Sequence, residues 1–352
     1  MLARLLSKDP PNNRLLSLLL AFVAVILTTA PFLGLGADGL NLAAKILIFI
    51  LLVASFDLLL GYSGNVSFAH TMFFGIGAYG LALSMSLLGS TWTAMLIGLV
   101  GALAVSLLLS VLIGIFSLRV KAIFFAMITL AVAAVFQTFV AQQSWLTGGE
   151  DGINFRLPNL LQPSFRWMEE PLLGVVIGGR FLSYYLIFGV VVVCFLLLLR
   201  IVNSPFGRVL QALRENDFRA GAIGYNTLWF RVMASVLSAL FATIAGFLLS
   251  LWLRYSGPDV SLSFEIMIDT LLMLVIGGMG TLYGAILGAA LFLVAQSYLR
   301  DLLGLVYSAL EGQAFALVFE PDRWLFWLGL LFVVSVYTLP MGLVGKLRQL
   351  KR

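Results

Sequence analysis

Long apolar runs alternate with short polar stretches along the whole chain of 352 residues. A helix needs about 20 consecutive apolar residues to cross a bilayer, whereas the strands of a membrane barrel would show an alternating pattern. The continuous runs therefore predict an all-α polytopic membrane protein with about ten transmembrane helices. The predicted spans are residues 15–35, 40–60, 71–89, 92–116, 122–143, 181–202, 228–253, 264–276, 284–303 and 324–344.

Two polar segments, residues 144–180 and 203–226, are longer than a minimal connection between spans. Neither has the character of a soluble domain and no low-complexity linker divides the chain, so residues 1–352 are expected to form one transmembrane domain. Most of the 21 Lys and Arg residues lie on one side when both termini are placed in the cytoplasm, as the positive-inside rule requires. In that orientation the first segment is an outer loop and the second is cytoplasmic. The eighth span is too short to cross alone, and its end is expected in the Gly-rich stretch that follows.

Composition excludes a soluble protein. Hydrophobic residues make up 61% of the chain and charged residues only 11%, whereas about a quarter of an ordinary soluble domain is charged. Cys194 is the only cysteine, which excludes disulfides and cysteine-based metal sites, and no other metal site is expected. The net charge of +5 reflects topology rather than nucleic-acid binding. The first apolar run has no convincing cleavage site after it and is interpreted as a retained helix.

The chain carries no signature for binding ATP. A phosphate-binding loop needs G-x-x-x-x-G-K-[ST], because clustered backbone amides and a lysine must surround the phosphates. Gly345-Lys346 is the only Gly-Lys pair, and Leu347 follows it. We therefore expect no cofactor in this chain, and any ATP-driven process needs a partner subunit.

The segment from residue 57 to residue 80 combines glycines with polar side chains next to apolar spans. Irregular polar backbone is tolerated at membrane depth only where it packs inside protein or lines a cavity. Two interpretations follow: close helix packing through small residues, or broken, re-entrant helices that line a transport path. Candidate path residues are Asp57, Tyr62, Ser63, Asn65, Ser67, His70 and, from a later span, Asp269. Candidate packing residues are Gly64, Gly75, Gly77, Gly280, Gly284 and Gly288, the last three repeating at every fourth position.

Carboxylates inside the predicted spans need an explanation, because a charged group at the bilayer centre costs about 3 kcal/mol on insertion scales. Asp57, Glu265 and Asp269 lie in apolar surroundings, and the last two share one helix face. They could line the path, or form a gate with Lys45 or Arg254. A structural ion pair or a helix end that faces water is the alternative.

Four segments, in the same order along the chain, resemble one known family. GYSGNVSFAHTMFFGIGAYG (61–80) is similar to the signature of permease subunits of branched-chain, or hydrophobic, amino acid ABC importers. TGGEDGI (147–153) resembles the outer-loop motif of that family, residues 204–226 resemble its cytoplasmic loop, and residues 276–292 resemble its late Gly-rich helix. The resemblance covers nearly the whole chain, and the long outer loop favours the M-type permease over the shorter H-type. Permeases of urea and short-chain amide importers resemble the same family.

The resemblance implies the transmembrane domain of an ABC importer, which forms the translocation path by alternating access. The implied partners are a sister permease in a heterodimer, two cytoplasmic ATPase subunits that hold ATP and Mg, and an extracytoplasmic binding protein. The implied location is a bacterial-type plasma (inner) membrane. The residues expected to contact the binding protein are Thr147, Gly149, Glu150 and Asp151.

Residues 203–226 are expected to receive force from the ATPase, as the resemblance implies. Their apolar residues recur at helical spacing, and such a stripe could be the apolar anchor of a docked helix. A helix that lies on lipid headgroups is the alternative. The apolar stripe consists of Phe206, Val209, Leu210 and Leu213. The residues expected to couple to the ATPase are Phe206, Leu210, Leu213, Arg214, Glu215, Asn216, Asp217 and Gly224.

Two other classes of function remain as alternatives. An ion-coupled secondary transporter would use Asp57 or Asp269 as its coupling carboxylate. An intramembrane enzyme would depend on His70, the single histidine, without any metal-ligand spacing around it.

Overall fold

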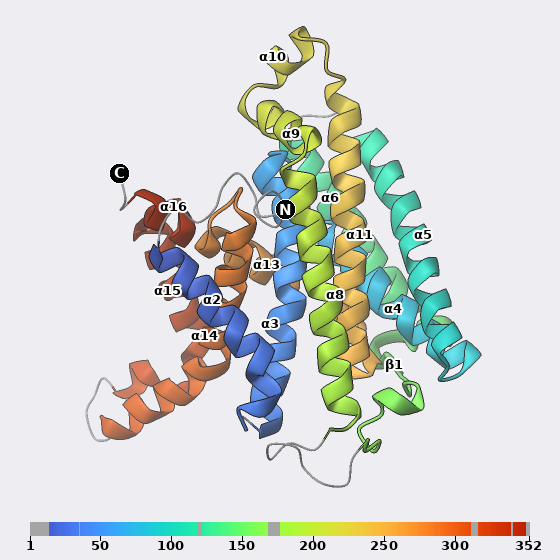
Figure 1. The fold of residues 1–352 in the computed structure, drawn as a ribbon, viewed down its shortest axis with the longest axis vertical. Coiled ribbons are helices and arrows are strands. Elements are labelled where there is room, and N and C mark those ends of the chain that lie inside the picture. Colours follow the sequence, from blue (N-terminus) through green and yellow to red (C-terminus); the bar gives the residue numbers. More distant parts are fainter. Residues whose placement is uncertain are drawn as a thin grey trace.

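The computed structural model describes residues 14–34, 36–117, 122–167, 177–310, 316–338 and 341–349 (Figure 1). In these ranges ten helical segments are long and apolar enough to cross a membrane, which confirms the fold class predicted from the apolar runs. Both ends of the chain and part of the predicted outer loop, residues 168–176, lie outside the described residues, so the expected location of the termini is not tested. The long helices are α2 (Arg14–Thr29), α3 (Gly36–Asp57), α4 (His70–Leu88), α5 (Trp92–Ser117), α6 (Ala122–Gln142), α8 (Gly179–Val202), α11 (Thr227–Leu253), α13 (Phe264–Gly277), α14 (Leu282–Ala309) and α15 (Trp324–Thr338).

Shorter elements connect these helices. Asn and Ser side chains begin several of them: Asn226 caps α11 by accepting from the backbone N–H of Trp229 at 3.2 Å, and Ser263 caps α13 in the same way. The short helices are α7 (Ser144–Thr147), α9 (Pro205–Glu215), α10 (Asp217–Ala222), α12 (Pro258–Ser261) and α16 (Gly342–Gln349), with single turns η1 (Ala30–Phe32), η2 (Leu58–Tyr62), η3 (Gly149–Asp151), η4 (Asn159–Leu161), η5 (Ala316–Phe319) and η6 (Pro321–Arg323).

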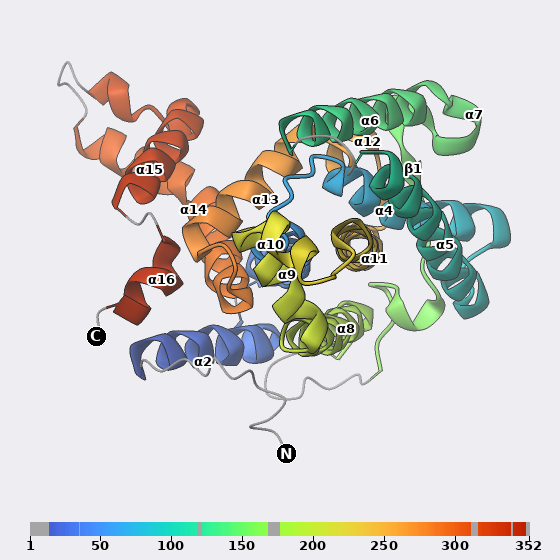
Figure 2. The same cartoon turned by 90° about the horizontal axis from the view of Figure 1, so that it is seen from above.

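Helices α3, α4 and α11 form the centre of the bundle, and the other spans surround them (Figure 2). In the most apolar part of α3, 83% of the residues are buried, against 17% in α2 and in α6. A peripheral helix of a soluble protein would carry polar residues on its outer side. Here the outer sides of α5 and α6 are apolar and exposed, as expected of a surface that faces lipid.

The central helices α4 and α11 touch through their backbones. A Cβ atom on Gly77 would lie 1.8 Å from the carbonyl oxygen of Thr243, and one on Gly246 would lie 1.7 Å from the carbonyl oxygen of Phe74. Only glycine permits this approach, so Gly77 packs against another helix of the same chain. Ser238 adds a hydrogen bond of 2.7 Å from its Oγ to the carbonyl of Ser55, which joins α11 to α3.

The bundle has two different ends, which we call the α10 end and the β1 end. The α10 end carries α9 and α10, at the top of Figure 1. At the opposite end, β1 (Ile153–Asn154) pairs antiparallel with β2 (Tyr255–Ser256). This pairing ties the segment that follows α6 to the end of α11.

Helix α3 leads directly into a distorted turn, the single π-helical turn η2. The eighth span covers Pro258–Gly277 and is long enough to cross, because α12 adds length at its start; the expected extension into the Gly-rich stretch is not seen beyond Gly277. The last predicted span, 324–344, lies within the apolar segment Pro321–Leu347, of which residues 339–340 lie outside the described residues.

Candidate functional site

Helix α9 lies against the α10 end of the bundle with its apolar stripe turned inward. Val209, Leu210 and Leu213 are buried, and Leu210 is 0% exposed. Phe206 stacks on Phe230 of α11, with ring centroids 5.8 Å apart. Pro205 occupies the first turn, where its missing N–H is harmless. The stripe predicted as the anchor for a partner is therefore already occupied by the chain's own bundle.

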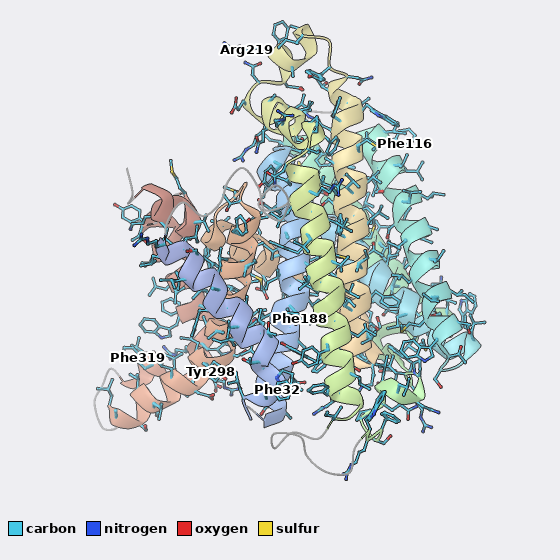
Figure 3. The ribbon with its side chains drawn as sticks, viewed as in Figure 1. Phe32, Phe116, Phe188, Arg219, Tyr298 and Phe319 are labelled. Atoms are coloured by element: carbon cyan, nitrogen blue, oxygen red, sulfur yellow. The ribbon has the colours of Figure 1, made fainter. Side chains whose placement is uncertain are left out.

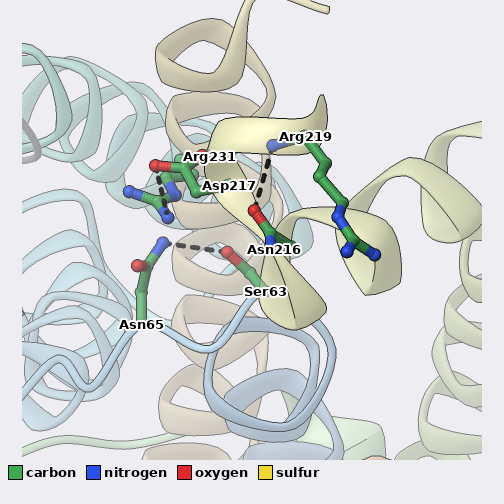
Figure 4. A network of polar contacts seen from close by, with 6 residues as sticks. All are labelled: Ser63, Asn65, Asn216, Asp217, Arg219 and Arg231. Atoms are coloured by element: carbon green, nitrogen blue, oxygen red, sulfur yellow. Dashed lines mark hydrogen bonds and ion pairs between the residues drawn. The ribbon is translucent and has the colours of Figure 1, made fainter. Parts of the chain in front are cut away.

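Helix α10 turns away from α9 at a single residue. The side-chain oxygen of Asn216 accepts from the backbone N–H of Arg219 at 3.0 Å and so begins α10 (Figure 4). Asp217 in the first turn forms an ion pair with Arg231 of α11 at 3.2 Å. Both groups keep some contact with solvent, so this pair contributes about 0.5 kcal/mol and can be broken cheaply. Gly224 follows α10 with φ of +101°, a value suited to glycine.

Helix α10 and the turn after it expose apolar side chains at the α10 end. Phe218 is 86% exposed and Ile223 is 78% exposed, and Tyr225 beyond them is also exposed. Arg219 of the same helix lies at the α10 end of the molecule (Figure 3). Glu215, Asn216 and Asp217 are exposed in the same region. Several exposed apolar groups in one short segment at a polar end of a protein mark an interaction site.

Two helix breaks meet below α9. Asp57, the last residue of α3, accepts a hydrogen bond of 2.7 Å from the backbone N–H of Gly280, in the turn between α13 and α14. Arg214 of α9 donates from Nη1 to the carbonyl of Gly61 in η2. The junction therefore contains residues from three distant parts of the sequence. Neither Lys45, which is exposed, nor Arg254 provides the partner considered for Asp57.

The polar residues of the Gly-rich signature are buried and paired within the chain. His70 Nε2 lies 2.9 Å from Ser55 Oγ, and Asn65 donates to Ser63 Oγ at 2.8 Å (Figure 4). Tyr62 and Ser67 are buried as well. These contacts explain how polar side chains are tolerated beside apolar spans, and their role in a path stays a prediction.

A family model for the permease component of branched-chain amino acid transport systems matches residues 39–336. The chain belongs to this family. It is 29% identical over 298 residues to the high-affinity branched-chain amino acid transport system permease protein LivM of Salmonella typhimurium, covering 81% of this chain and 68% of LivM. The LivM protein of Escherichia coli is 28% identical with the same coverage. The permease BraD of Pseudomonas aeruginosa is 24% identical over 84% of this chain and 91% of BraD. The M-type resemblance is confirmed.

Asp269 of this family member lies half-buried between α13 and α14. Its Oδ2 is 3.5 Å from Nε2 of Gln296, a long contact. Glu265, one turn earlier on the same helix, is exposed. Both carboxylates therefore lie on a face of a membrane-spanning helix that the described chain leaves partly open. Such a face is expected to meet water or protein rather than lipid.

The outer-loop motif divides into buried and exposed residues. Thr147 is buried and donates to the carbonyl of Val140 at 2.6 Å, and Gly149 is buried beside it. Glu150 and Asp151 are exposed at the β1 end. Contact with another protein stays a prediction. Of the four residues predicted for it, Glu150 and Asp151 are the two that are accessible in this structure. On the same end, burial and the neighbouring Arg180 lower the pKa of Arg254 below its ordinary value.

The predicted repeat of small residues, Gly280, Gly284 and Gly288, divides between a helix and the turn before it. Gly284 and Gly288 lie in α14, where added Cβ atoms would overlap the backbone at the end of α13 and in the turn that follows it. Gly280 lies before α14, with φ of +80°, so it serves the turn rather than a helix face. Gly75 packs against Leu262, whereas Gly64 lies in a loop with φ of +76°.

Sequence reasoning missed the partners of several predicted residues. Arg231, Ser55 and the Gly61 carbonyl each contact a predicted residue that belongs to another helix or turn. Nothing in the local pattern indicates these pairs, because each depends on how helices pack.

Proposed function

We propose that this chain is a permease subunit of an ATP-driven importer for branched-chain amino acids. It forms the translocation path together with a sister permease, by alternating access between two faces of the membrane. Two ATPase subunits that bind ATP and Mg²⁺ drive the change, and an extracytoplasmic protein delivers the substrate. Family membership supports the substrate class, since the relatives LivM and BraD are named as branched-chain amino acid permeases.

The exposed apolar tip of α10 is the observation that carries this proposal. Phe218 and Ile223 are largely accessible at the end of the bundle, with charged residues around them. An apolar centre with a polar rim is the composition of a protein interface. The occupant proposed is an ATPase subunit, because the chain carries no phosphate-binding loop of its own. The α10 end is then cytoplasmic, in keeping with Arg200, Arg208 and Arg219 there.

The sister permease is proposed to cover the open face of α13. A carboxylate that faces lipid is costly, so Glu265 and Asp269 favour a hydrated path or a protein partner on that side. Asp269 would line the path, where it could meet the ammonium group of an amino acid. At the β1 end, Glu150 and Asp151 are available to the binding protein.

The test is transport by the complex that copurifies with this chain, reconstituted into vesicles with its binding protein. We expect uptake of labelled L-leucine that requires ATP and is insensitive to a proton uncoupler. Uptake that persists without ATPase subunits and collapses with the uncoupler would instead identify a secondary transporter. Uptake of labelled urea but not of leucine would overturn the substrate assignment.

A further inference from the structure

Asp57 has one carboxylate oxygen that is satisfied and one that is not. The residue is 0% exposed, and its Oδ1 accepts from the N–H of Gly280. The backbone N–H of Thr281 also acts on this carboxylate, but Oδ2 is buried and makes no hydrogen bond of ordinary geometry in the described part of the chain. A buried acceptor without a donor is unfavourable, and more so when it carries charge. The structure therefore leaves a strong acceptor open at the end of α3.

Position 61, which lies against Asp57, has room for no residue larger than glycine. A Cβ atom on Gly61 would lie 1.8 Å from Asp57 Oδ1 and 2.5 Å from the backbone nitrogen of Gly280. The backbone of the π-helical turn η2 therefore lies in direct contact with Asp57 and Gly280, whose hydrogen bond joins α3 to the turn before α14. A movement of Gly61 must therefore displace both the end of α3 and the turn before α14.

Arg214 reaches this junction from outside the spans. The residue belongs to α9 and is exposed, yet its Nη1 donates to the carbonyl of Gly61. The same Nη1 is 2.9 Å from where a Cβ of Gly280 would stand, and the charge of Arg214 acts on Asp57. A guanidinium has five N–H donors, so it can satisfy either acceptor. A carboxylate oxygen is the stronger one, because charge-assisted bonds exceed neutral ones.

We propose that Arg214 is the positioning residue through which movement of α9 reaches the transport path, by exchanging the Gly61 carbonyl for the open oxygen of Asp57. The inference rests on the ATP-driven function proposed above. In the described state Arg214 holds η2 and Asp57 Oδ2 is unpaired. In the second state Arg214 pairs with Asp57 and releases η2. Because Asp57 also holds Gly280, α3 and the start of α14 change together, which is the two-state element that coupling requires.

Paired substitutions in the reconstituted complex test this exchange. Arg214→Gln removes the charge, and Asp57→Asn keeps Oδ1 as the acceptor for Gly280 while weakening the second position. Each should lower ATP-dependent uptake of labelled L-leucine about tenfold while ATP hydrolysis stays within about twofold, because energy is spent without transport. The double variant should transport no worse than either single variant, since both break one contact. Arg214→Lys should restore part of the uptake.

Arg208→Gln is the matched control, an exposed arginine on the same helix that should transport normally. Normal uptake in Arg214→Gln, or losses that multiply in the double variant, would overturn the proposal. So would a parallel fall of uptake and hydrolysis at normal complex yield, which would assign Arg214 to ATPase binding alone. If Arg214→Gln does not assemble, Asp57→Asn decides, since it leaves α9 intact. A wild-type complex without ATP-dependent uptake would refute the proposed function itself.

Discussion

Helices α9 and α10 follow one another in the same polar segment, yet their apolar residues end in opposite environments. In α9 the residues Val209, Leu210 and Leu213 are buried on the chain's own bundle. In α10 and the turn after it, Phe218 and Ile223 are exposed. The break at Asn216 separates the two helices. One polar loop thus contains an attached helix and a presented helix, and hydropathy alone does not distinguish them.

A charge placed on α9 should have the largest effect. Leu210→Asp introduces an unpaired carboxylate at a site that is 0% exposed, and should weaken the attachment of α9 by about 3–5 kcal/mol. Hydrogen exchange of residues 205–215 in the purified complex measures this. Ile223→Asp, the same change on the presented side, should leave that exchange unaltered. Equal effects of the two variants would show that the two helices are not distinct in this way.

Removing side-chain volume from α9 should be the next largest effect. Leu213→Ala deletes buried methyl groups, and its expected cost is about 2–4 kcal/mol in the packing of α9. The exposed neighbour Gln211 provides the control, because Gln211→Ala should change stability by less than about 0.5 kcal/mol. Thermal unfolding in detergent compares the two. A Leu213→Ala protein as stable as Gln211→Ala would contradict the buried position.

Truncation on α10 should change binding and not stability. Phe218→Ala should weaken the ATPase subunit's affinity by about 1–2 kcal/mol, roughly tenfold, as expected of a central aromatic in an interface. Titration of the detergent-solubilised chain with the ATPase measures the change. Phe116→Ala, which removes an exposed ring from α5 (Figure 3), is the matched control and should bind normally. Unchanged affinity in Phe218→Ala would remove the tip from the interface.

The ion pair that holds α10 to α11 should give the smallest effect. Asp217→Asn breaks the ion pair with Arg231. It should lower the free energy needed for α10 to open locally by about 0.5 kcal/mol. Hydrogen exchange of residues 217–222 reports it, and the difference should vanish at about 1 M salt because screening already weakens the pair. A difference that persists at high salt would mean that Asp217 acts through another contact.

The sequence was sufficient for features that depend on local chemistry. Continuous apolar runs located the spans, because a bilayer imposes a minimum length of apolar helix. Small residues at helical spacing predicted close packing, and in the structure Gly77, Gly284 and Gly288 lie where a Cβ atom would overlap neighbouring backbone.

The sequence was insufficient where two distant segments meet. Gly280 continues the spacing of Gly284 and Gly288, but the helix starts at Leu282, so the same spacing covers a turn. The apolar stripe of α9 has the same spacing whether the helix docks on a partner or on its own chain. Only the packed structure shows that it docks on the chain's own bundle. The contact of Arg214 with Gly61 joins residues 153 positions apart. No periodicity encodes such a pair.

The backbone contact between α4 and α11 has a consequence for permeation. Gly77 and Gly246 bring the two helices together so closely that even a methyl group is excluded on either side. A file of water or a solute the size of an amino acid is far larger than a methyl group, so none can pass along that seam. Ser238 and Ser55 join α3 to α11, so a path for solute must run elsewhere than through the crossing of α4 and α11 in every state that preserves these contacts.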